Sequence, residues 1–542
     1  MKKRLLALLL ASIMTVSVCA CGGNAGEEAA NNDGGRVQVE NYVPTYPIVE
    51  EPITITALVV GQDMTVSNTR ILWDEVEKLT NIHIEWENID IDAYSTRLAS
   101  GQWPDLIAKN MGQTATYDYG VLGGKFVNYM DYLDIMPNFK AAIEEYPEIL
   151  AYATQLNGEV YNLFRISGNS ATSVSCRPHY RKDVLAAAGV TEEPTSIEEF
   201  YDALVKCRDF YGVPNYIHDK NETSSYTQSL FGAFGDLTQL DYSDDGTGTI
   251  VFPRGTEQYK EYVKFLHKLH DEGLMHKEYL TLESAAILKL VQGGNIAFFP
   301  QGAAQSLTID DLSGDWNNLG TLAPFTSEMD PTAELCAYPD YNQDHGMYIN
   351  VDSPYVEEIC KMLDIAYAKE EVAPGTNLKG VNFGSGPEFT TWVDNGDGTY
   401  TELVPEGATN RSSYISQQYR WSHAFGLNTA WGGMKSSTPG NAQMRQQGYL
   451  EKIHPYMNDR VVSVKNLRFT EDEQYVIDNK YGEIKAYYDQ MEAEFITGAR
   501  DIDAEWDTFQ ETLKQMGIDE VTAVIQASYT RLLETQAAVK AE

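Results

Sequence analysis

Residues 53–60 read Ile-Thr-Ile-Thr-Ala-Leu-Val-Val, an alternation of apolar and polar side chains that passes into a continuous apolar run. This pattern is typical of a strand that enters a buried parallel sheet. Residues 69–80 carry apolar side chains at helical spacing, and residues 82–86 alternate again. A short helix at 94–99 and a third strand at 105–108 follow. The order strand, helix, strand, helix, strand predicts an α/β lobe with right-handed crossovers.

The carboxyl ends of the strands are where open α/β sheets bind their ligands. In this chain the third predicted strand is followed by residues 109–118, a mostly polar segment. Topology alone therefore predicts three ligand-binding residues in this segment, namely Lys109, Gln113 and Tyr117.

The length of the chain, 542 residues, exceeds what one hydrophobic core comfortably fills. Hydrophobic residues make up 43% of the sequence, which is enough for two large cores. We therefore expect two lobes, with these boundaries: a signal peptide at 1–20, a flexible tether at 21–50, the first part of lobe 1 at 51–165, the main part of lobe 2 at 166–335, hinge crossings, a hairpin and parts of both lobes at 336–470, and a C-terminal helical segment at 471–542.

Local signals predict several further elements. Ser196, with Glu199 three residues later, is typical of a helix N-terminus. The run Asp-Asn-Gly-Asp-Gly at 394–398 predicts the turn of a β-hairpin. Residues 470–542 show amphipathic spacing, so we expect helices that pack across a lobe.

The N-terminus is typical of an exported protein. Basic residues at 2–4 precede an apolar run at 5–18, which is shorter than the roughly 20 residues needed to cross a bilayer. The following Val-Cys-Ala-Cys at 18–21 resembles a bacterial lipobox, although Cys19 stands where a smaller residue is commoner. The resemblance implies that Cys21 is lipidated with a diacylglycerol and becomes the new N-terminus. An ordinary signal peptide, in which Cys21 is incidental, is the alternative.

The net charge of −39 excludes some classes of partner. Nucleic-acid binding needs clustered Lys and Arg, so we expect no nucleic-acid partner. Adsorption onto an anionic bilayer is disfavoured for the same reason, and a lipid anchor would make it unnecessary.

Four cysteines remain beyond the signal region. These cysteines occur singly and lie far apart in the sequence, which does not resemble a disulfide scaffold or a zinc site. We therefore predict mostly free, buried thiols and leave open a disulfide among them. These residues are Cys176, Cys207, Cys336 and Cys360.

Two constellations suggest metal sites, and neither is complete. His267 and His270 lie at i and i+3 on a predicted helix, without the pattern His-Glu-x-x-His. Asp241-x-Ser-x-Asp245-Gly imitates the start of an EF-hand loop, but Phe252 stands where a bidentate carboxylate is required. We expect no metal and no cofactor. The sequence also contains no Gly-x-Ser-x-Gly, P-loop or dinucleotide-binding motif.

Short motifs occur in one order along some 450 residues. They are residues 73–82 (WDEVEKLTNI), 98–107 (LASGQWPDLI), 158–163 (GEVYNL), 180–189, 194–200 (PTSIEEF), 269–274 (LHDEGL), 495–498 (FITG), Trp506 and 516–518 (MGI). Taken together, these motifs resemble the solute-binding lipoproteins of family 1, in particular the large oligosaccharide-type members of bacterial ABC importers.

This resemblance implies a two-lobed α/β fold of the periplasmic-binding-protein type (type II), with a hinge, C-terminal helices and a ligand between the lobes. It also implies that ABC permease subunits are the partners, and that the protein is anchored at the extracytoplasmic face of the cell membrane. We expect a monomer. One departure concerns residues 209–216, where several large members carry a calcium loop and this chain does not. We therefore expect no calcium there.

The aromatic content, 34 Tyr and 8 Trp, suits a carbohydrate ligand. Planar rings stack on the C–H face of a sugar, while Asp, Asn, Arg and Gln bind its hydroxyls. For each Trp, burial in a core or between lobes is the alternative, because Trp is usually largely buried. On this argument we predict six further ligand-binding residues: Trp421, Trp431, Arg177, Tyr180, Trp316 and Trp392.

The sequence therefore predicts a non-enzymatic, lipid-anchored binding component of an ABC importer that captures an oligosaccharide. Two other classes stay open. One is a secreted glycosidase or polysaccharide lyase, which needs a pair of carboxylates or a Tyr, His and Arg group. The other is a binding or sensory lipoprotein without its own transporter, for which a peptide or another solute remains a possible ligand.

Overall fold

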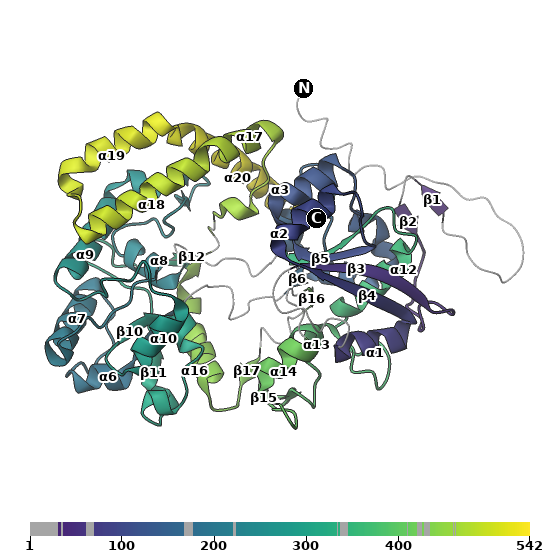
Figure 1. Cartoon of the computed structure of the whole chain (residues 1–542), viewed down its shortest axis with the longest axis horizontal. Helices are drawn as coiled ribbons and strands as arrows, with labels where there is room; N and C mark the ends of the chain where they lie inside the picture. The colour runs from purple at the N-terminus through teal and green to yellow at the C-terminus, as the bar shows by residue number, and fades with distance from the viewer. Residues whose placement is uncertain are drawn as a thin grey trace, which may run out of the picture.

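The two predicted lobes lie side by side, and the C-terminal helices cover one side of lobe 2 (Figure 1). The computed structural model describes residues 31–33, 36–60, 70–166, 177–219, 224–332, 334–336, 345–408, 410–419, 425–427, 434–458, 460 and 462–541.

Lobe 1 is built on a four-stranded sheet with the order β13-β5-β3-β4. β3 (Ile53–Val60) runs parallel to β4 (Ile82–Ile89) and to β5 (Leu106–Asn110). β13 (His345–Ile349) pairs antiparallel with β5. The three parallel strands confirm the α/β order predicted from the sequence, whereas the antiparallel strand comes from a distant part of the chain.

Both faces of this sheet are covered, because successive side chains of a strand point to opposite sides. Ala57 and Val59 belong to the larger core of lobe 1, whereas Leu58 and Ile107 belong to a smaller core on the other face. The further elements of lobe 1 are α1 (Ile71–Thr80), α2 (Ile91–Ala99), α3 (Gly112–Thr116), η3 (Tyr117–Leu122), η4 (Tyr129–Ile135), α4 (Pro137–Glu145), α5 (Glu148–Ala153), β6 (Arg165–Ile166), α12 (Val356–Asp364), η8 (Ile365–Tyr367), α13 (Gly380–Ser385), α14 (Arg411–Gln418) and β16 (Gly426–Leu427).

The segment before β3 differs from the predicted flexible tether. β2 (Arg36–Gln38) pairs with β1 (Asn31–Asp33), and Val37 is buried at 3% exposure. Tyr42 and Tyr46 pack against the core of lobe 1. Residues 36–50 therefore form an arm on lobe 1, because their spaced apolar side chains find an apolar surface to cover.

Lobe 2 contains a three-stranded antiparallel sheet with the order β10-β7-β11. Helix α7 begins as predicted, since the Ser196 side chain accepts a hydrogen bond from the backbone N–H of Glu199. The elements of lobe 2 are β7 (Pro178–Arg181), α6 (Lys182–Ala187), α7 (Ile197–Tyr211), α8 (Ser225–Gly232), β8 (Ser243–Asp244), β9 (Ile250–Val251), η5 (Pro253–Gly255), α9 (Glu257–Asp271), α10 (Ser284–Gln292), β10 (Phe298–Pro300), α11 (Gln301–Ala304), η6 (Asp310–Leu312), η7 (Trp316–Asn318), β11 (Leu319–Thr321), β12 (Leu335–Cys336), α16 (Asn441–Gly448), η9 (Tyr449–Ile453), η10 (His454–Tyr456) and β18 (Met457–Asn458).

The chain passes between the lobes at least three times, after β6, after β12 and before α16. β6 pairs with β16, and β12 pairs with β18, so the first two of these passages start from paired strands. The predicted hairpin is confirmed as β14 (Trp392–Asp394) and β15 (Thr399–Glu402), which β17 (Lys435–Ser436) extends into a small sheet.

The C-terminal segment is helical, as its amphipathic spacing predicts. Most of its apolar side chains join the core of lobe 2, among them Trp506, Phe509 and Ile525. The elements are η11 (Val464–Asn466), α17 (Glu471–Val476), η12 (Ile477–Tyr481), α18 (Gly482–Thr497), α19 (Ile502–Met516) and α20 (Ile518–Ala541).

None of the helices in the described ranges combines the length and the apolar character that crossing a bilayer requires. Cys207 and Cys360 are buried, unpaired thiols, as predicted. Burial raises the pKa of Cys207 to about 12, so this thiol stays protonated and unreactive at neutral pH. Cys176 lies outside the described residues, and only the backbone of Cys336 is described.

Candidate functional site

On lobe 1, the parallel strands direct their carboxyl ends to one edge of the sheet. α3 and η3 follow β5 at this edge, so the predicted segment lies where topology expects it. Thr116 hydrogen-bonds to the Tyr348 hydroxyl at 3.2 Å, which ties α3 to β13. Arg70 precedes α1 at the same edge, and burial lowers the pKa of its guanidinium.

Tyr117, a predicted ligand-binding residue, is half-buried and begins the π-helical turn η3. This turn packs tightly, because a Cβ at Gly120 would lie only 2.8 Å from the ring of Tyr161. Single π-helical turns often occur at functional sites. For Lys109 and Gln113 the structure describes only the backbone, which lies in β5 and α3 respectively.

On lobe 2, Arg177 is the first described residue after the first passage between the lobes. Its backbone N–H donates to the Gln301 side chain at 3.1 Å, and its guanidinium lies 4.9 Å from the ring centre of Tyr449. Arg177 is 4% exposed. The start of β7 therefore holds a buried cation and an amide side chain close to the passage between the lobes.

His179 lies two residues further along β7 and is completely buried. Its Nδ1 lies 3.2 Å from the Gly320 carbonyl oxygen and from the Thr321 hydroxyl. Burial, with the nearby charges of Arg177 and Arg445, lowers the pKa of His179 to about 3. The imidazole is therefore neutral, and the positive charge of this cluster comes from the two arginines.

Tyr180 and Trp392, two of the predicted ligand-binding residues, are buried in cores. Tyr180 is 4% exposed, donates its hydroxyl to Glu193 at 2.7 Å, and lies so close to Gly320 that a Cβ there would be 2.2 Å from its ring. Trp392 is 2% exposed, and its Nε1–H donates to the Gly386 carbonyl at 3.0 Å. The prediction that both rings face a sugar is not supported, because each ring is covered by its own lobe or hairpin.

The other predicted residues divide into two groups. Trp316 is half-buried in η7 and packs against a hydrophobic cluster of lobe 2. Trp421, Trp431 and Cys21 lie outside the described residues.

Sequence reasoning missed Arg445, which belongs to α16. Its Nε donates to Asn441 at 2.6 Å, and burial lowers the pKa of its guanidinium. The helix reads Asn-Ala-Gln-Met-Arg-Gln-Gln-Gly, whose polar composition suggests a solvated helix. Only the packing of α16 on β11 brings Arg445 to His179.

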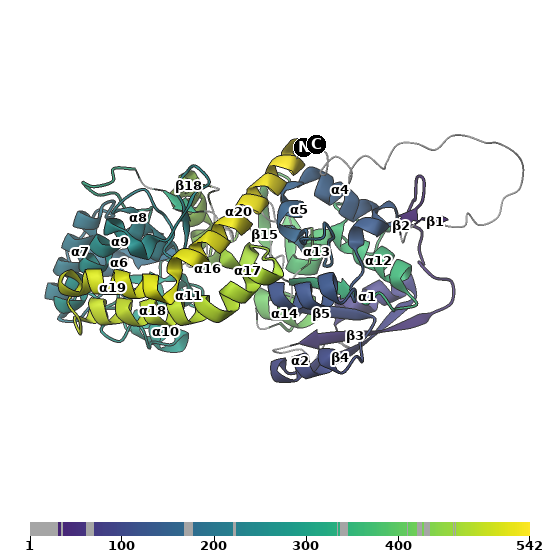
Figure 2. The ribbon, with the colours of Figure 1, turned by 90° about the horizontal axis from the view of Figure 1, so that it is seen from above.

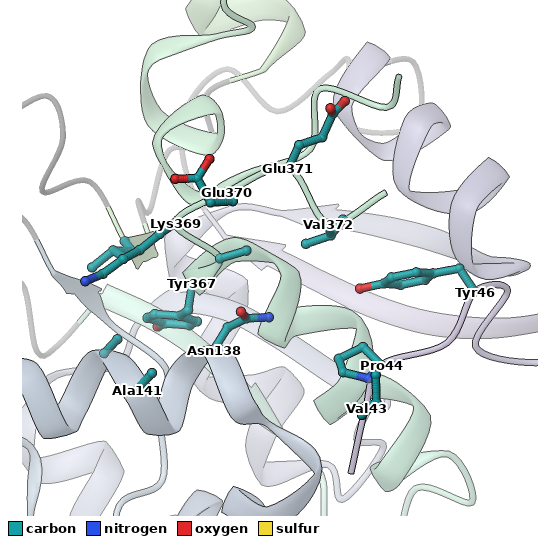
Figure 3. A pocket seen from close by; sticks show the side chains of 13 residues that line it. Val43, Pro44, Tyr46, Asn138, Ala141, Tyr367, Lys369, Glu370, Glu371 and Val372 are labelled. Atoms are coloured by element: carbon teal, nitrogen blue, oxygen red, sulfur yellow. The ribbon is translucent and has the colours of Figure 1, made fainter. Parts of the chain in front are cut away.

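A separate cavity of about 440 Å³ lies within lobe 1, between the N-terminal arm, α4 and the segment after η8. Figure 3 shows Tyr46 on one side of it, with Asn138 and Val372 around it. Beneath it, Asp364 accepts hydrogen bonds from the backbone N–H groups of Asn138 and Phe139. Burial raises the pKa of Asp364 to about 7 despite these donors. All residues that line this cavity belong to lobe 1, so it is distinct from the region between the lobes.

The acidic residues of the EF-hand-like run bind protein groups. Asp241 accepts hydrogen bonds from the hydroxyls of Tyr481 and Tyr488, at 2.7 and 2.9 Å. Asp245 accepts from Thr247 within the turn between β8 and β9. Within the described ranges, no group of three or more His, Cys, Asp or Glu side chains is arranged to hold a metal ion.

Comparison with known proteins shows full-length relatives. The chain is 22% identical, over 96% of both chains, to the fructooligosaccharide ABC transporter substrate-binding protein FusA of Streptococcus pneumoniae. The solved structure of S. pneumoniae FusA in complex with kestose has a TM-score of 0.69 and 20% identity, and it covers 89% of this chain and 100% of that one. A solute-binding protein of Bifidobacterium longum infantis described as HMO-binding has a TM-score of 0.69 and 16% identity, covering 89% and 99%.

Two family models match the chain. A domain of unknown function (DUF3502) matches residues 465–534. The model of the bacterial extracellular solute-binding proteins matches residues 65–373, more than half of the chain. These residues include β4, β5 and β13 of the lobe 1 sheet and the whole three-stranded sheet of lobe 2. The protein therefore belongs to the family of bacterial extracellular solute-binding proteins.

Proposed function

We propose that this protein is the extracytoplasmic solute-binding component of an ABC importer, and that it captures an oligosaccharide between its two lobes. The observation that carries the proposal is the similarity to FusA over 96% of both chains. The likeness in fold to FusA bound to kestose agrees with it. ABC permease subunits are then the partners that receive the solute.

Closure of two lobes around a solute is a known way to hold it and release it. On lobe 2, Gln301 is half-buried beside Arg177 and carries an amide that suits sugar hydroxyls, whereas the guanidinium of Arg177 is buried against the ring of Tyr449. On lobe 1, Tyr117 begins the turn η3 that follows β5 and α3, at the edge of the sheet where ligands of such sheets bind. Binding and release need no covalent step, so we propose a binder and not an enzyme.

A thermal-shift and calorimetric screen tests this function on the chain without residues 1–20 and with Cys21→Ser. The probes are kestose and nystose, other plant and host oligosaccharides, and short peptides. A glycan present at a hundredfold excess over its Kd is expected to stabilise the folded protein by about 2.7 kcal/mol. Chromatography of the glycan after overnight incubation is expected to show no cleavage.

Arg177→Ala is expected to weaken glycan binding by about 10- to 100-fold, because the start of β7 beside the passage loses the buried guanidinium that packs on the ring of Tyr449. Arg208→Ala is the matched control, since Arg208 pairs with Asp209 on the outer helix α7. Stabilisation by peptides alone would contradict the choice of solute, and cleavage of the glycan would contradict the binder.

We also propose that Cys21 carries the lipid anchor, on the basis of the lipobox-like residues 18–21. Cys21→Ser is expected to move the protein from the membrane fraction to the culture medium, because the thiol that takes the lipid is absent. Immunoblots of both fractions measure this. Cys19→Ser is the control and is expected to remain in the membrane fraction. Retention of both variants in the membrane would place the anchor elsewhere.

A further inference from the structure

Helix α5 belongs to the hydrophobic cores of both lobes. Ile149 and Ala153 are one helical turn apart and pack in the core of lobe 1. Ala151 and Tyr152 pack in the core cluster of lobe 2 and the C-terminal helices. A short helix that comes before the first passage between the lobes is thus held from both sides.

Arg468 joins this helix to the C-terminal segment. Its guanidinium donates to the backbone carbonyl of Tyr152. Its own carbonyl accepts hydrogen bonds from the Ser528 hydroxyl at 2.7 Å and from the Arg531 guanidinium at 2.9 Å. Arg531 is fixed in turn by an ion pair with Glu473. A chain of polar contacts therefore runs from α5 to α20 and α17.

The end of α20 makes a second contact with α5. The Gln536 side chain donates to the Tyr152 hydroxyl at 2.8 Å. Earlier residues of the same helix, including Val521 and Ile525, are buried in the core of lobe 2. Figure 2 shows α20 running from the side of lobe 2 to α5. One continuous helix of 24 residues therefore spans from one lobe to the other.

A third contact reaches the candidate site, because η11 lies against α3, the helix that precedes Tyr117. We propose that residues 465–534, which match a domain of unknown function, act with the end of α20 as a clamp between the lobes. This C-terminal clamp consists of Arg468, Ser528, Arg531 and Gln536 and their partner Tyr152. It holds α5 against lobe 2 and sets how far the lobes separate when no ligand is bound.

The clamp has a consequence for affinity, which rests on the proposed function. Only conformers in which both lobes reach the solute bind it, so the apparent Kd rises as their population falls. The backbone passages alone leave the lobes freer to separate than the passages and the clamp do together. Loosening the clamp is therefore expected to populate open conformers.

Small-angle X-ray scattering of the unliganded chain, without residues 1–20 and with Cys21→Ser, tests the clamp. The double variant Arg468→Met and Gln536→Leu is expected to show a larger radius of gyration and a broader distance distribution than the parent chain. Its affinity for the glycan found in the screen is expected to fall by about three- to tenfold.

The matched control is Arg500→Met with Gln490→Leu. These side chains donate hydrogen bonds to Glu494 and Glu505, which belong to the C-terminal segment. The control is expected to scatter like the parent chain. Superimposable curves for the clamp variant, with an unchanged circular dichroism spectrum, would overturn the proposal.

A milder variant, Tyr152→Phe, covers the case in which the double variant does not fold, because it removes only the hydroxyl that Gln536 contacts. Faster amide hydrogen exchange in α5, with unchanged exchange in α18, is then the expected result, and unchanged exchange in α5 overturns the proposal. Both measurements use unliganded protein. A result that contradicts the proposed clamp is therefore distinguishable from a result that shows no glycan binding.

Discussion

Replacing Arg254 by alanine is expected to lower the free energy of unfolding of lobe 2 by about 3–5 kcal/mol, as for a buried pair that loses one partner. Arg254 is completely buried and is among the largest buried side chains. Its guanidinium lies 4.0 Å from the ring centre of Tyr488 and 3.6 Å from Glu492, both in α18. It also donates to the carbonyl of Leu240. The variant leaves a cavity where the Arg254 side chain was, and it leaves the Leu240 carbonyl without this hydrogen-bond donor.

Urea unfolding, followed by tryptophan fluorescence, measures this loss. Arg208→Ala is again the control, because it loses only a partly exposed ion pair with Asp209 and one hydrogen bond to the Glu272 carbonyl, together expected to contribute about 1–2 kcal/mol. Since α18 belongs to the C-terminal segment, the Arg254 variant is also expected to bind glycan more weakly. A loss no larger than that of the control would show that Arg254 does not hold α18.

Gly426→Ala is expected to destabilise lobe 1 by about 2–6 kcal/mol, because backbone strain and a steric overlap add. Gly426 has φ +96, which side-chain-bearing residues rarely adopt. A Cβ there would lie 2.4 Å from the backbone oxygen of Ala366. Gly426 pairs with Arg165 in β6, just before the first passage between the lobes, so the strain acts where the lobes are joined.

Thermal unfolding with and without glycan measures this effect. Gly407→Ala is the matched control, since Gly407 has φ +80 but no atom within 4 Å of a Cβ. The control is expected to lose only the free energy that a left-handed backbone conformation costs a residue with a Cβ, about 1–2 kcal/mol. The stabilisation by glycan is expected to shrink in Gly426→Ala and to persist in the control. Equal losses in both variants would contradict the predicted overlap with Ala366.

Much of the fold was predictable because its signals are local. The alternation in 53–60 and the helical spacing in 69–80 predicted β3 and α1, and Ser196 predicted the start of α7. Each of these patterns depends on which side of one element is buried. The tether was predicted too long, because the apolar residues of 36–50 are widely spaced and reveal their role only against the surface of lobe 1.

The candidate site was harder to predict, because ring exposure depends on contacts between distant residues. Trp392 stands beside a polar turn in the sequence, yet its ring is buried with Tyr400 of the hairpin and Val381 of α13. Arg177, predicted from the same reasoning, is also buried, against the ring of Tyr449, and its role in ligand binding stays a prediction. Arg445 carried no signal, since α16 is mostly polar and meets β11 only in three dimensions.

The sequence by itself determined the α/β order of lobe 1, the hairpin, the helical C-terminus and the similarity to a family of binding proteins. These properties follow from periodicity, turn chemistry and short motifs, which act over a few residues. Only the tertiary structure decided which rings are buried and that α5 belongs to both cores. The contact between Gln536 and Tyr152 joins residues 384 positions apart. No local pattern encodes such a pair, because its free energy arises only when both lobes are folded.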